Sequence, residues 1–410
     1  MTLREDANQI IQNAIHAALP DQAVKNALAD LPLPEQIYLV SVGKAAWQMA
    51  RAAANLLGNR VQGGVVITKY QHSMGPIGNL RIFEAGHPIP DENSFRATQA
   101  AMELVRPLGA SDAVVFLLSG GGSALFESPL IPEDELTDLT RQLLSSGADI
   151  VEMNTVRKRL SAVKGGRFAA LCAPAKVCSV VLSDIIGDPL DMIASGPAYP
   201  DSSTCRQALD IVEKYKLRLS PQALALLGQE TPKTLTNVET RVTGSVRQLC
   251  TSASETAAAL GYRPVTLTAS LCCTARDAGS FFASMAAYHQ DSTESLAFIA
   301  GGETVVELTG HGLGGRNQEL ALAAADNMDG MRETAVFSVG SDGTDGPTDA
   351  AGGYVDGTTR AALLDRGIQI PAVLRENDAY HALQACGGLI MTGPTGTNVN
   401  DLSVLLIRRH

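Results

Sequence analysis

Three consecutive glycines lie between two serines at residues 119–123, directly after the apolar run 113–118. A run this short and apolar is typical of a strand buried on both faces, and the residues that follow suit a helix. Because glycine has no Cβ, backbone N–H groups in such a turn can face a ligand, and a following helix adds positive charge. The pattern therefore predicts a binding site for an anion such as phosphate, formed by Ser119, Gly120, Gly121, Gly122 and Ser123. A turn chosen only for steric freedom is the alternative, because short glycine patterns are common.

A lysine occupies a comparable place earlier in the chain. Gly43 and Lys44 follow the predicted strand 37–42 and precede the predicted helix 45–57. The helix dipole disfavours an ammonium group at this end, so an anion between Lys44 and the helix would account for the lysine. A solvated surface lysine is the alternative.

Two aspartates, Asp184 and Asp188, follow the predicted strand 177–183. Mg²⁺ needs only one or two protein carboxylates beside substrate phosphates, so both are candidate metal ligands, Asp184 before Asp188. Helix capping or an Asx turn is the other explanation for either residue. A later aspartate-rich stretch, 342–349, lacks the spacing of a calcium loop and is either another metal site or a turn-rich segment.

An arginine follows two glycines at the start of the predicted helix 318–325. The planar guanidinium of Arg316 suits a carboxylate or a phosphoryl group. Its alternative is a surface ion pair with Glu303 or Glu319, and Asn317 is a candidate N-cap of the helix.

The segment 154–167 is polar and cationic. As a helix it would align Asn154, Arg157 and Lys158, and Lys164 would end the run before two glycines. Such a segment either covers a negatively charged ligand or is a solvated helix face.

Composition excludes several classes of protein. The net charge of −11 over 410 residues, with no basic run, argues against a nucleic-acid-binding surface. Seven scattered cysteines with no C-x-x-C pair favour thiols in a reducing compartment, so we expect a cytoplasmic location. Residues 4–19 have the spacing of an amphipathic helix rather than of a signal peptide, and no run reaches membrane-spanning length. The oligomeric state stays open, a homodimer included.

Predicted strands alternate with predicted helices through most of the chain, which indicates a parallel, doubly wound sheet with ligands beyond the carboxyl ends of its strands. This alternation of strands and helices is interrupted at 228–246, where we place a domain boundary. The predicted domains are therefore 1–235 and 245–410. The predicted strands are 37–42, 65–68, 80–85, 113–118, 177–183, 265–267, 296–300, 335–339 and 404–407; the predicted helices are 45–57, 94–106, 134–145, 276–287 and 318–325. No G-x-G-x-x-G follows a strand, and P-loop, G-x-S-x-G and H-E-x-x-H motifs are absent, which argues against the usual nicotinamide fold, P-loop enzymes and the serine and zinc hydrolases with those motifs.

Taken together, these loops resemble those of the class II glycerate 2-kinases, the family with a C-terminal MOFRL domain. The matching stretches span nearly the whole chain in order: 42–46, 118–124, 154–161, 164–166, 182–188, 195–197, 301–304, 314–320, 342–346, 348–352 and 393–398. The turn at 271–276 departs from the family, whose members more often carry an acidic, glycine-containing turn there.

The resemblance implies two α/β domains enclosing a cleft, the first Rossmann-like with a mostly parallel sheet and the second a smaller MOFRL-type domain. It implies transfer of the γ-phosphoryl group of ATP to the 2-hydroxyl of D-glycerate, with Mg²⁺ as cofactor. The residue roles it implies are catalytic for Lys44, Arg316 and Asp184, nucleotide- or phosphate-binding for 119–123, Glu303 and Asn317, substrate-binding for Asn154, Arg157 and Lys164, and metal-binding for Asp184 and Asp188.

Two other functions are weighed against this one. Relatives of the family sometimes carry the label hydroxypyruvate reductase, which would require NADH or NADPH, and the missing dinucleotide motif argues against it. A non-catalytic sensor that closes on a small acid would explain an anion site but not Asp184.

Overall fold

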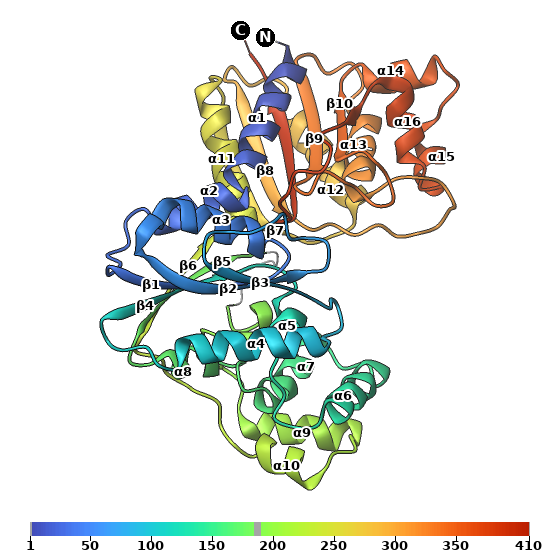
Figure 1. Cartoon of the computed structure of the whole chain (residues 1–410). Helices are drawn as coiled ribbons and strands as arrows, with labels where there is room; N and C mark the ends of the chain where they lie inside the picture. The colour runs from blue at the N-terminus through green and yellow to red at the C-terminus, as the bar shows by residue number, and fades with distance from the viewer. Residues whose placement is uncertain (1, 184–189, 410) are drawn as a thin grey trace. The chain divides into compact units, whose positions relative to one another are not determined.

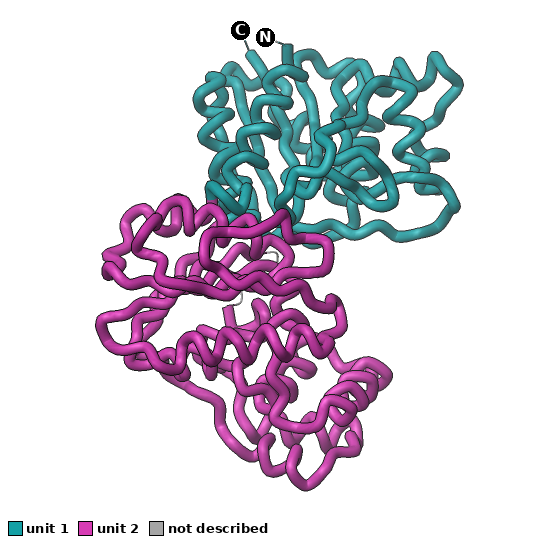
Figure 2. Tube along the Cα trace, viewed as in Figure 1, with its two compact units in different colours: residues 1–22, 184–187, 244–410 teal, residues 23–183, 188–243 magenta. Residues whose placement is uncertain are grey.

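A computed structural model describes residues 2–183 and 190–409 and divides the chain into two compact units (Figures 1 and 2). Unit 1 comprises residues 1–22, 184–187 and 244–410, and unit 2 comprises residues 23–183 and 188–243. The N-terminal helix α1 (Leu3–Ala17) therefore packs with the C-terminal half of the chain, so the units differ from the expected domains 1–235 and 245–410. No helix of the described residues is long and apolar enough to cross a membrane.

Unit 2 contains a six-stranded sheet in the order β3-β2-β1-β4-β5-β6, and every neighbouring pair is parallel. The expected doubly wound sheet is thus confirmed. Its strands are β1 (Gln36–Val42), β2 (Val61–Lys69), β3 (Leu80–Ala85), β4 (Asp112–Leu118), β5 (Lys176–Leu182) and β6 (Val238–Thr243). The last strand lies inside the stretch 228–246, where the sequence predicts a boundary between domains.

Helices cover both faces of this sheet (Figure 1). Helix α3 packs on β1 and β2 from one side, and α4 packs on β2 and β3 from the other. The helices and 3-10 turns that fall wholly or mostly in this unit are α2 (Pro20–Leu28), α3 (Ala46–Leu57), η1 (Gly58–Arg60), α4 (Glu92–Val105), α5 (Gly122–Leu125), α6 (Glu133–Ser145), α7 (Ile150–Arg157), η2 (Lys158–Leu160), α8 (Arg167–Cys172), η3 (Ile193–Ser195), α9 (Cys205–Tyr215) and α10 (Pro221–Leu227).

The strand order reverses between β1 and β4, because the chain adds strands on one side of β1 and then on the other. Ligands of doubly wound folds bind at such a reversal, beyond the carboxyl ends of the strands, where the loops after β1 and β4 lie. Both strands are largely apolar and almost wholly buried. Their burial fixes where each strand ends, and so where Lys44 and the glycine-rich loop 119–123 lie.

Unit 1 also has a six-stranded sheet, in the order β11-β10-β9-β12-β8-β7, but it is mixed. Only β7 and β8 are parallel; β12 runs antiparallel to both β8 and β9. The strands are β7 (Arg263–Leu271), β8 (Leu296–Gly302), β9 (Thr334–Gly340), β10 (Gly352–Asp356), β11 (Leu389–Ile390) and β12 (Asp401–Ile407); the other helices are α11 (Val246–Ala259), α12 (Ala275–Tyr288), α13 (Arg316–Asp326), α14 (Thr359–Leu364), α15 (Ile370–Arg375) and α16 (Ala379–Cys386).

Candidate active site

The glycine loop, residues 119–123, is held against the end of β1. The N–H of Lys44 donates to the carbonyl oxygen of Gly120 at 2.9 Å, and the Ser119 hydroxyl accepts from the N–H of Ala45 at 3.1 Å. The approach is so close that a Cβ on Gly43 would lie 2.2 Å from the Ser119 Oγ, and Gly43 has a φ of +123°. Glycine is therefore required at 43 for the two loops to meet.

The N–H groups of the loop are available to a ligand. None of the hydrogen bonds among residues 2–183 and 190–409 uses the backbone N–H of residues 120–123 as donor. Successive free amides of this kind form a concave anion site. The helix expected after the glycines is only the four-residue turn α5, so the amides themselves, rather than a helix dipole, supply the positive potential.

Lys44 is exposed, and among the described residues its ammonium group has no hydrogen-bond or ion-pair partner. Both backbone polar groups of Lys44 are engaged: its carbonyl oxygen lies 3.1 Å from Nδ1 of His72, and its N–H donates to the carbonyl oxygen of Gly120. The backbone of Lys44 is therefore held in place beside the N–H groups of residues 120–123, and its ammonium group can bind an anion.

Lys164 is placed differently from the expectation that it contacts substrate. It is fully buried, and its ammonium donates to the carbonyl oxygens of Ser123 at 2.8 Å and Phe126 at 3.0 Å. Its third contact is an ion pair with Glu127 at 2.9 Å. Burial lowers the pKa of Lys164, and Glu127 opposes that shift. With three partners it has no donor left for a substrate, so it supports the glycine loop from behind.

Asn154 is also buried, and it reaches the glycine loop through a serine that the sequence did not single out. The Ser195 hydroxyl donates to Oδ1 of Asn154 at 3.0 Å and lies 3.2 Å from the hydroxyl of Ser123. Both Ala194 and Ser195 have left-handed backbone, with φ of 51° and 62°. Two such non-glycine residues in succession store strain of about 1–3 kcal/mol each, which is characteristic of functional turns.

Arg157, the third expected substrate-binding residue, is half-buried at the end of α7. Its Nε is buried and has no hydrogen-bond partner among the described residues. The positive charge of Arg157 lowers the pKa of Lys164, so the guanidinium lies near the lysine that supports the glycine loop.

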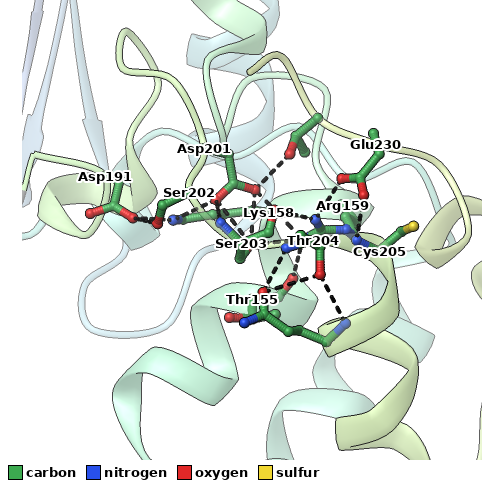
Figure 3. A network of polar contacts seen from close by, with 12 residues as sticks. Thr155, Lys158, Arg159, Asp191, Asp201, Ser202, Ser203, Thr204, Cys205 and Glu230 are labelled. Atoms are coloured by element: carbon green, nitrogen blue, oxygen red, sulfur yellow. Dashed lines mark hydrogen bonds and ion pairs between the residues drawn. The ribbon is translucent and has the colours of Figure 1, made fainter. Parts of the chain in front are cut away.

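A buried ionic network anchors the segment that carries Ser195 (Figure 3). Lys158 pairs with Asp201 at 3.1 Å and with Asp191 at 3.4 Å, and Arg159 pairs with Asp201 at 3.5 Å and with Glu230 at 3.2 Å. Burial alone would raise the pKa of Asp201, but hydrogen bonds from Thr231 and the Lys158 charge bring it below its usual value. The cationic segment is therefore not a solvated helix face, because α7 ends at Arg157 and the next two cations point into this network.

In unit 1, Arg316 begins α13 and is clamped by two carboxylates. Its Nε and Nη2 donate to the two oxygens of Asp401 at 2.6 and 3.1 Å, and its Nη1 donates to Glu303 at 2.9 Å. Burial raises the pKa of Asp401, although Arg316 counteracts it. One third of the Arg316 side chain is exposed, and two of its five N–H donors remain for a ligand.

Asn317 is not the N-cap of α13. Gly315 holds that position, and the buried carboxylate of Asp345 accepts from the N–H groups of Asn317 at 3.1 Å and Gln318 at 2.9 Å. Burial raises the pKa of Asp345 to about 6 despite these bonds. The aspartate-rich stretch thus supplies a helix cap, and Asn317 is buried with its Oδ1 bonded to Ser338.

A cavity of about 540 Å³ adjoins Arg316 within unit 1. Its lining combines Glu303 and Arg316 with glycine backbone and the exposed apolar side chains of Val305 and Leu308. A carboxylate, a guanidinium and apolar surface around one cavity suit a ligand that has both polar groups and a flat apolar part.

The expected metal ligands Asp184 and Asp188 lie outside the described residues. Within 2–183 and 190–409, no group of three or more His, Cys, Asp or Glu side chains could hold a metal ion.

Each unit therefore gathers its own share of the expected residues. Unit 2 brings together Lys44, the glycine loop, Asn154 and Lys164, and unit 1 brings together Arg316, Glu303 and Asn317. Sequence reasoning missed four residues that contact or adjoin these groups: His87, Ser195, Asp345 and Asp401. Asp345 stood in the rejected calcium loop and Ser195 in the matching stretch 195–197, but neither was given a role; His87 and Asp401 have no local motif.

Comparisons with known proteins find two activities named among the relatives: glycerate kinase and, for two proteins of Agrobacterium vitis that are 39% and 38% identical over 90% and 99% of this chain, putative hydroxypyruvate reductase. The family model described as "Domain of unknown function (DUF4147)" matches residues 6–228, and the model described as "MOFRL family" matches residues 296–401. The chain is 51% identical over 412 residues to a D-glycerate 2-kinase of Thermotoga maritima, covering 99% of each protein, and 38% identical to a glycerate 2-kinase of Pyrococcus horikoshii, covering 99% and 98%. It also matches the crystal structure of glycerate kinase from Thermotoga maritima with a TM-score of 0.94 over 99% of each chain, at 51% identity.

Proposed function

The chain belongs to the glycerate kinase family with a C-terminal MOFRL domain, and from that membership we propose that it is a D-glycerate 2-kinase. The reaction transfers the γ-phosphoryl group of ATP to the 2-hydroxyl of D-glycerate. The observation that carries this proposal is the glycine loop: within the described part of the chain, neither the N–H groups of residues 120–123 nor the ammonium of Lys44 has a partner.

Phosphoryl transfer requires positioning and charge neutralisation more than covalent chemistry. We assign the amides of 120–123 and the Lys44 ammonium to the oxygens of the transferring phosphoryl group. In unit 1, the two N–H donors of Arg316 that have no partner among the described residues are assigned to phosphate oxygens of ATP, since a planar guanidinium matches two such oxygens. Preorganised donors of this kind are worth about 10²–10³ each in rate.

The acceptor is assigned to the side of the loop on which Asn154 lies. The guanidinium of the half-buried Arg157 is assigned to the carboxylate of glycerate. Lys164 and Ser195 would position the loop and Asn154 without touching substrate. Glu303 and the adjoining cavity of unit 1 are assigned to the ribose and base of the nucleotide, because a carboxylate accepts hydrogen bonds from sugar hydroxyls.

Mg²⁺ would neutralise charge on the phosphate oxygens of ATP, and its proposed ligands are Asp184 and Asp188. The absence of a three-residue metal cluster among the described residues fits an ion that takes most of its ligands from phosphate and water. All seven cysteines are free, which agrees with the proposed cytoplasmic location.

The test is product identification. Purified protein is incubated with ATP, Mg²⁺ and D-glycerate, and the products are followed by ³¹P NMR, which separates 2-phosphoglycerate from 3-phosphoglycerate. We expect ADP and 2-phosphoglycerate in equal amounts, with L-glycerate turned over far more slowly. Formation of 3-phosphoglycerate, or oxidation of NADH by hydroxypyruvate without ADP formation, would contradict the proposal.

A further inference from the structure

His87 lies against the glycine loop, although it comes from the far edge of the sheet. It follows β3, two strands away from β1 in the sheet order. A Cβ on Gly121 would nevertheless lie 3.0 Å from Cδ2 and 3.1 Å from Nε2 of the His87 ring, and 3.3 Å from Cγ of Lys44. Gly121 has a φ of +88°. The ring and the lysine stem therefore converge on Gly121, where the absence of a side chain leaves room for both.

The imidazole is available for chemistry. His87 is half-buried, and among the described residues neither ring nitrogen has a hydrogen-bond partner. The side chains that face it are Lys44 from the start of α3, Lys69 from the end of β2 and His72 from the turn after β2. Burial and then these neighbours lower the pKa of His87 below its usual value, so the ring is neutral at pH 7 and one nitrogen has a free lone pair.

Carboxylates described near the loop are already engaged. Glu127 is buried in its ion pair with Lys164, and Asp91, on the same loop as His87, accepts from Tyr70 at 2.6 Å and from the N–H of Ser94 at 2.9 Å. The side chains of residues 119–123 do not titrate at neutral pH. Among the described residues beside the glycine loop and Lys44, the neutral imidazole is therefore the group best able to take up a proton.

We propose that His87 is the general base of the phosphoryl transfer, accepting the proton of the substrate hydroxyl. As the hydroxyl oxygen bonds to the γ-phosphorus, the bond from phosphorus to the β,γ-bridging oxygen breaks and ADP leaves. The hydroxyl proton passes to the free ring nitrogen and then to solvent. This inference rests on the proposed kinase function and adds a catalytic residue to it.

The experiment compares the wild type with His87→Gln and His87→Ala, and with His16→Gln as a control at an exposed histidine of unit 1. A general base contributes about 10²–10⁴ in rate. We expect both His87 variants to lose at least about 100-fold in kcat while ATP binding by calorimetry stays within about threefold. The acid limb of the wild-type kcat–pH profile, with its midpoint below the usual histidine pKa, should be absent from both, and added imidazole should restore part of the His87→Ala rate.

The outcomes separate the two claims. A wild type that forms no phosphoglycerate overturns the kinase function and this inference with it. A wild type that is active, with His87 variants that keep their kcat or their acid limb, overturns the inference alone. Loss of ATP binding in both variants would make His87 a structural part of the glycine loop and would overturn the inference as well.

Discussion

At the level of single residues, the proposed site depends on which charged groups are already satisfied. Lys44 is exposed and has no partner among the described residues, whereas Lys164 uses all of its donors inside the protein. Both lysines stand beside glycines in the sequence, and the sequence analysis expects both at the site, Lys44 as a catalytic residue and Lys164 as a substrate-binding one. Burial and bonding partners distinguish Lys44, which can contact a substrate, from Lys164, which supports the glycine loop.

A first prediction concerns Lys164→Met. The substitution leaves the buried carboxylate of Glu127 without its cation, which costs about 3–5 kcal/mol. Urea unfolding should show this loss, and the double variant Lys164→Met, Glu127→Leu should recover much of it because neither charge is then buried alone. A double variant less stable than the single variant would contradict this account of the pair.

A second prediction concerns Glu303, which pairs with Arg316 but remains half-exposed beside the cavity of unit 1. If it accepts hydrogen bonds from the ribose, Glu303→Gln should raise KM for ATP by about tenfold and leave KM for D-glycerate nearly unchanged. Glu307→Gln is the matched control, because Glu307 is exposed on the same loop and does not line the cavity. Equal effects of the two variants would argue against nucleotide binding at Glu303.

At the level of elements, a close approach between two loops fixes the site in unit 2. The loop after β1 meets the loop after β4 only because residue 43 is glycine. Gly43→Ala should lower kcat by at least about tenfold, since its Cβ would displace the backbone of Ser119. Gly63→Ala is the control, because a Cβ at that position of β2 meets nothing within 4 Å. Steady-state kinetics should therefore separate the two substitutions; equal kcat values would contradict the role given to Gly43.

The start of α13 gives a prediction about pH. The folded state raises the pKa of Asp345 from 3.8 to about 6, so folding favours the protonated carboxyl. The resulting stabilisation is present below about pH 4 and is lost as the pH rises through about 6, by at most about 3 kcal/mol. Between pH 4 and pH 7, urea unfolding of the wild type should lose stability relative to Asp345→Asn. Parallel curves for the two proteins would show that Asp345 keeps an ordinary pKa.

At the level of the whole molecule, the alternation of strands and helices predicts the parallel sheet of unit 2 because its central strands β1, β4 and β5 are mostly apolar and buried. The same alternation does not reveal the mixed sheet of unit 1, since β12 enters between β8 and β9 from the end of the chain. Strand β6 is half-exposed and rich in polar residues, so its stretch resembles a linker in the sequence. Helix α1 shows its amphipathic spacing, but not that its partner is α11 in unit 1.

The candidate site likewise contains residues that the sequence could predict and residues that it could not. The glycine loop, Lys44 and Arg316 could be predicted because local residue order after a strand carries their chemistry. The contacts of Ser195 with Asn154, of Asp401 with Arg316 and of His87 with the glycine loop join residues at least 30 positions apart. No local spacing encodes such contacts, and only the folded chain brings the groups together.

The most direct test of the account measures single-turnover phosphoryl transfer by Lys44→Ala, Arg316→Ala and the double variant. Because each cation is proposed to neutralise phosphate charge during the transfer, each single variant should lose about 10³ in rate. Residues that act in one catalytic step are not additive, so the double variant should lose clearly less than the product of the two single losses. A rate within about threefold of the wild type in either single variant would contradict the account.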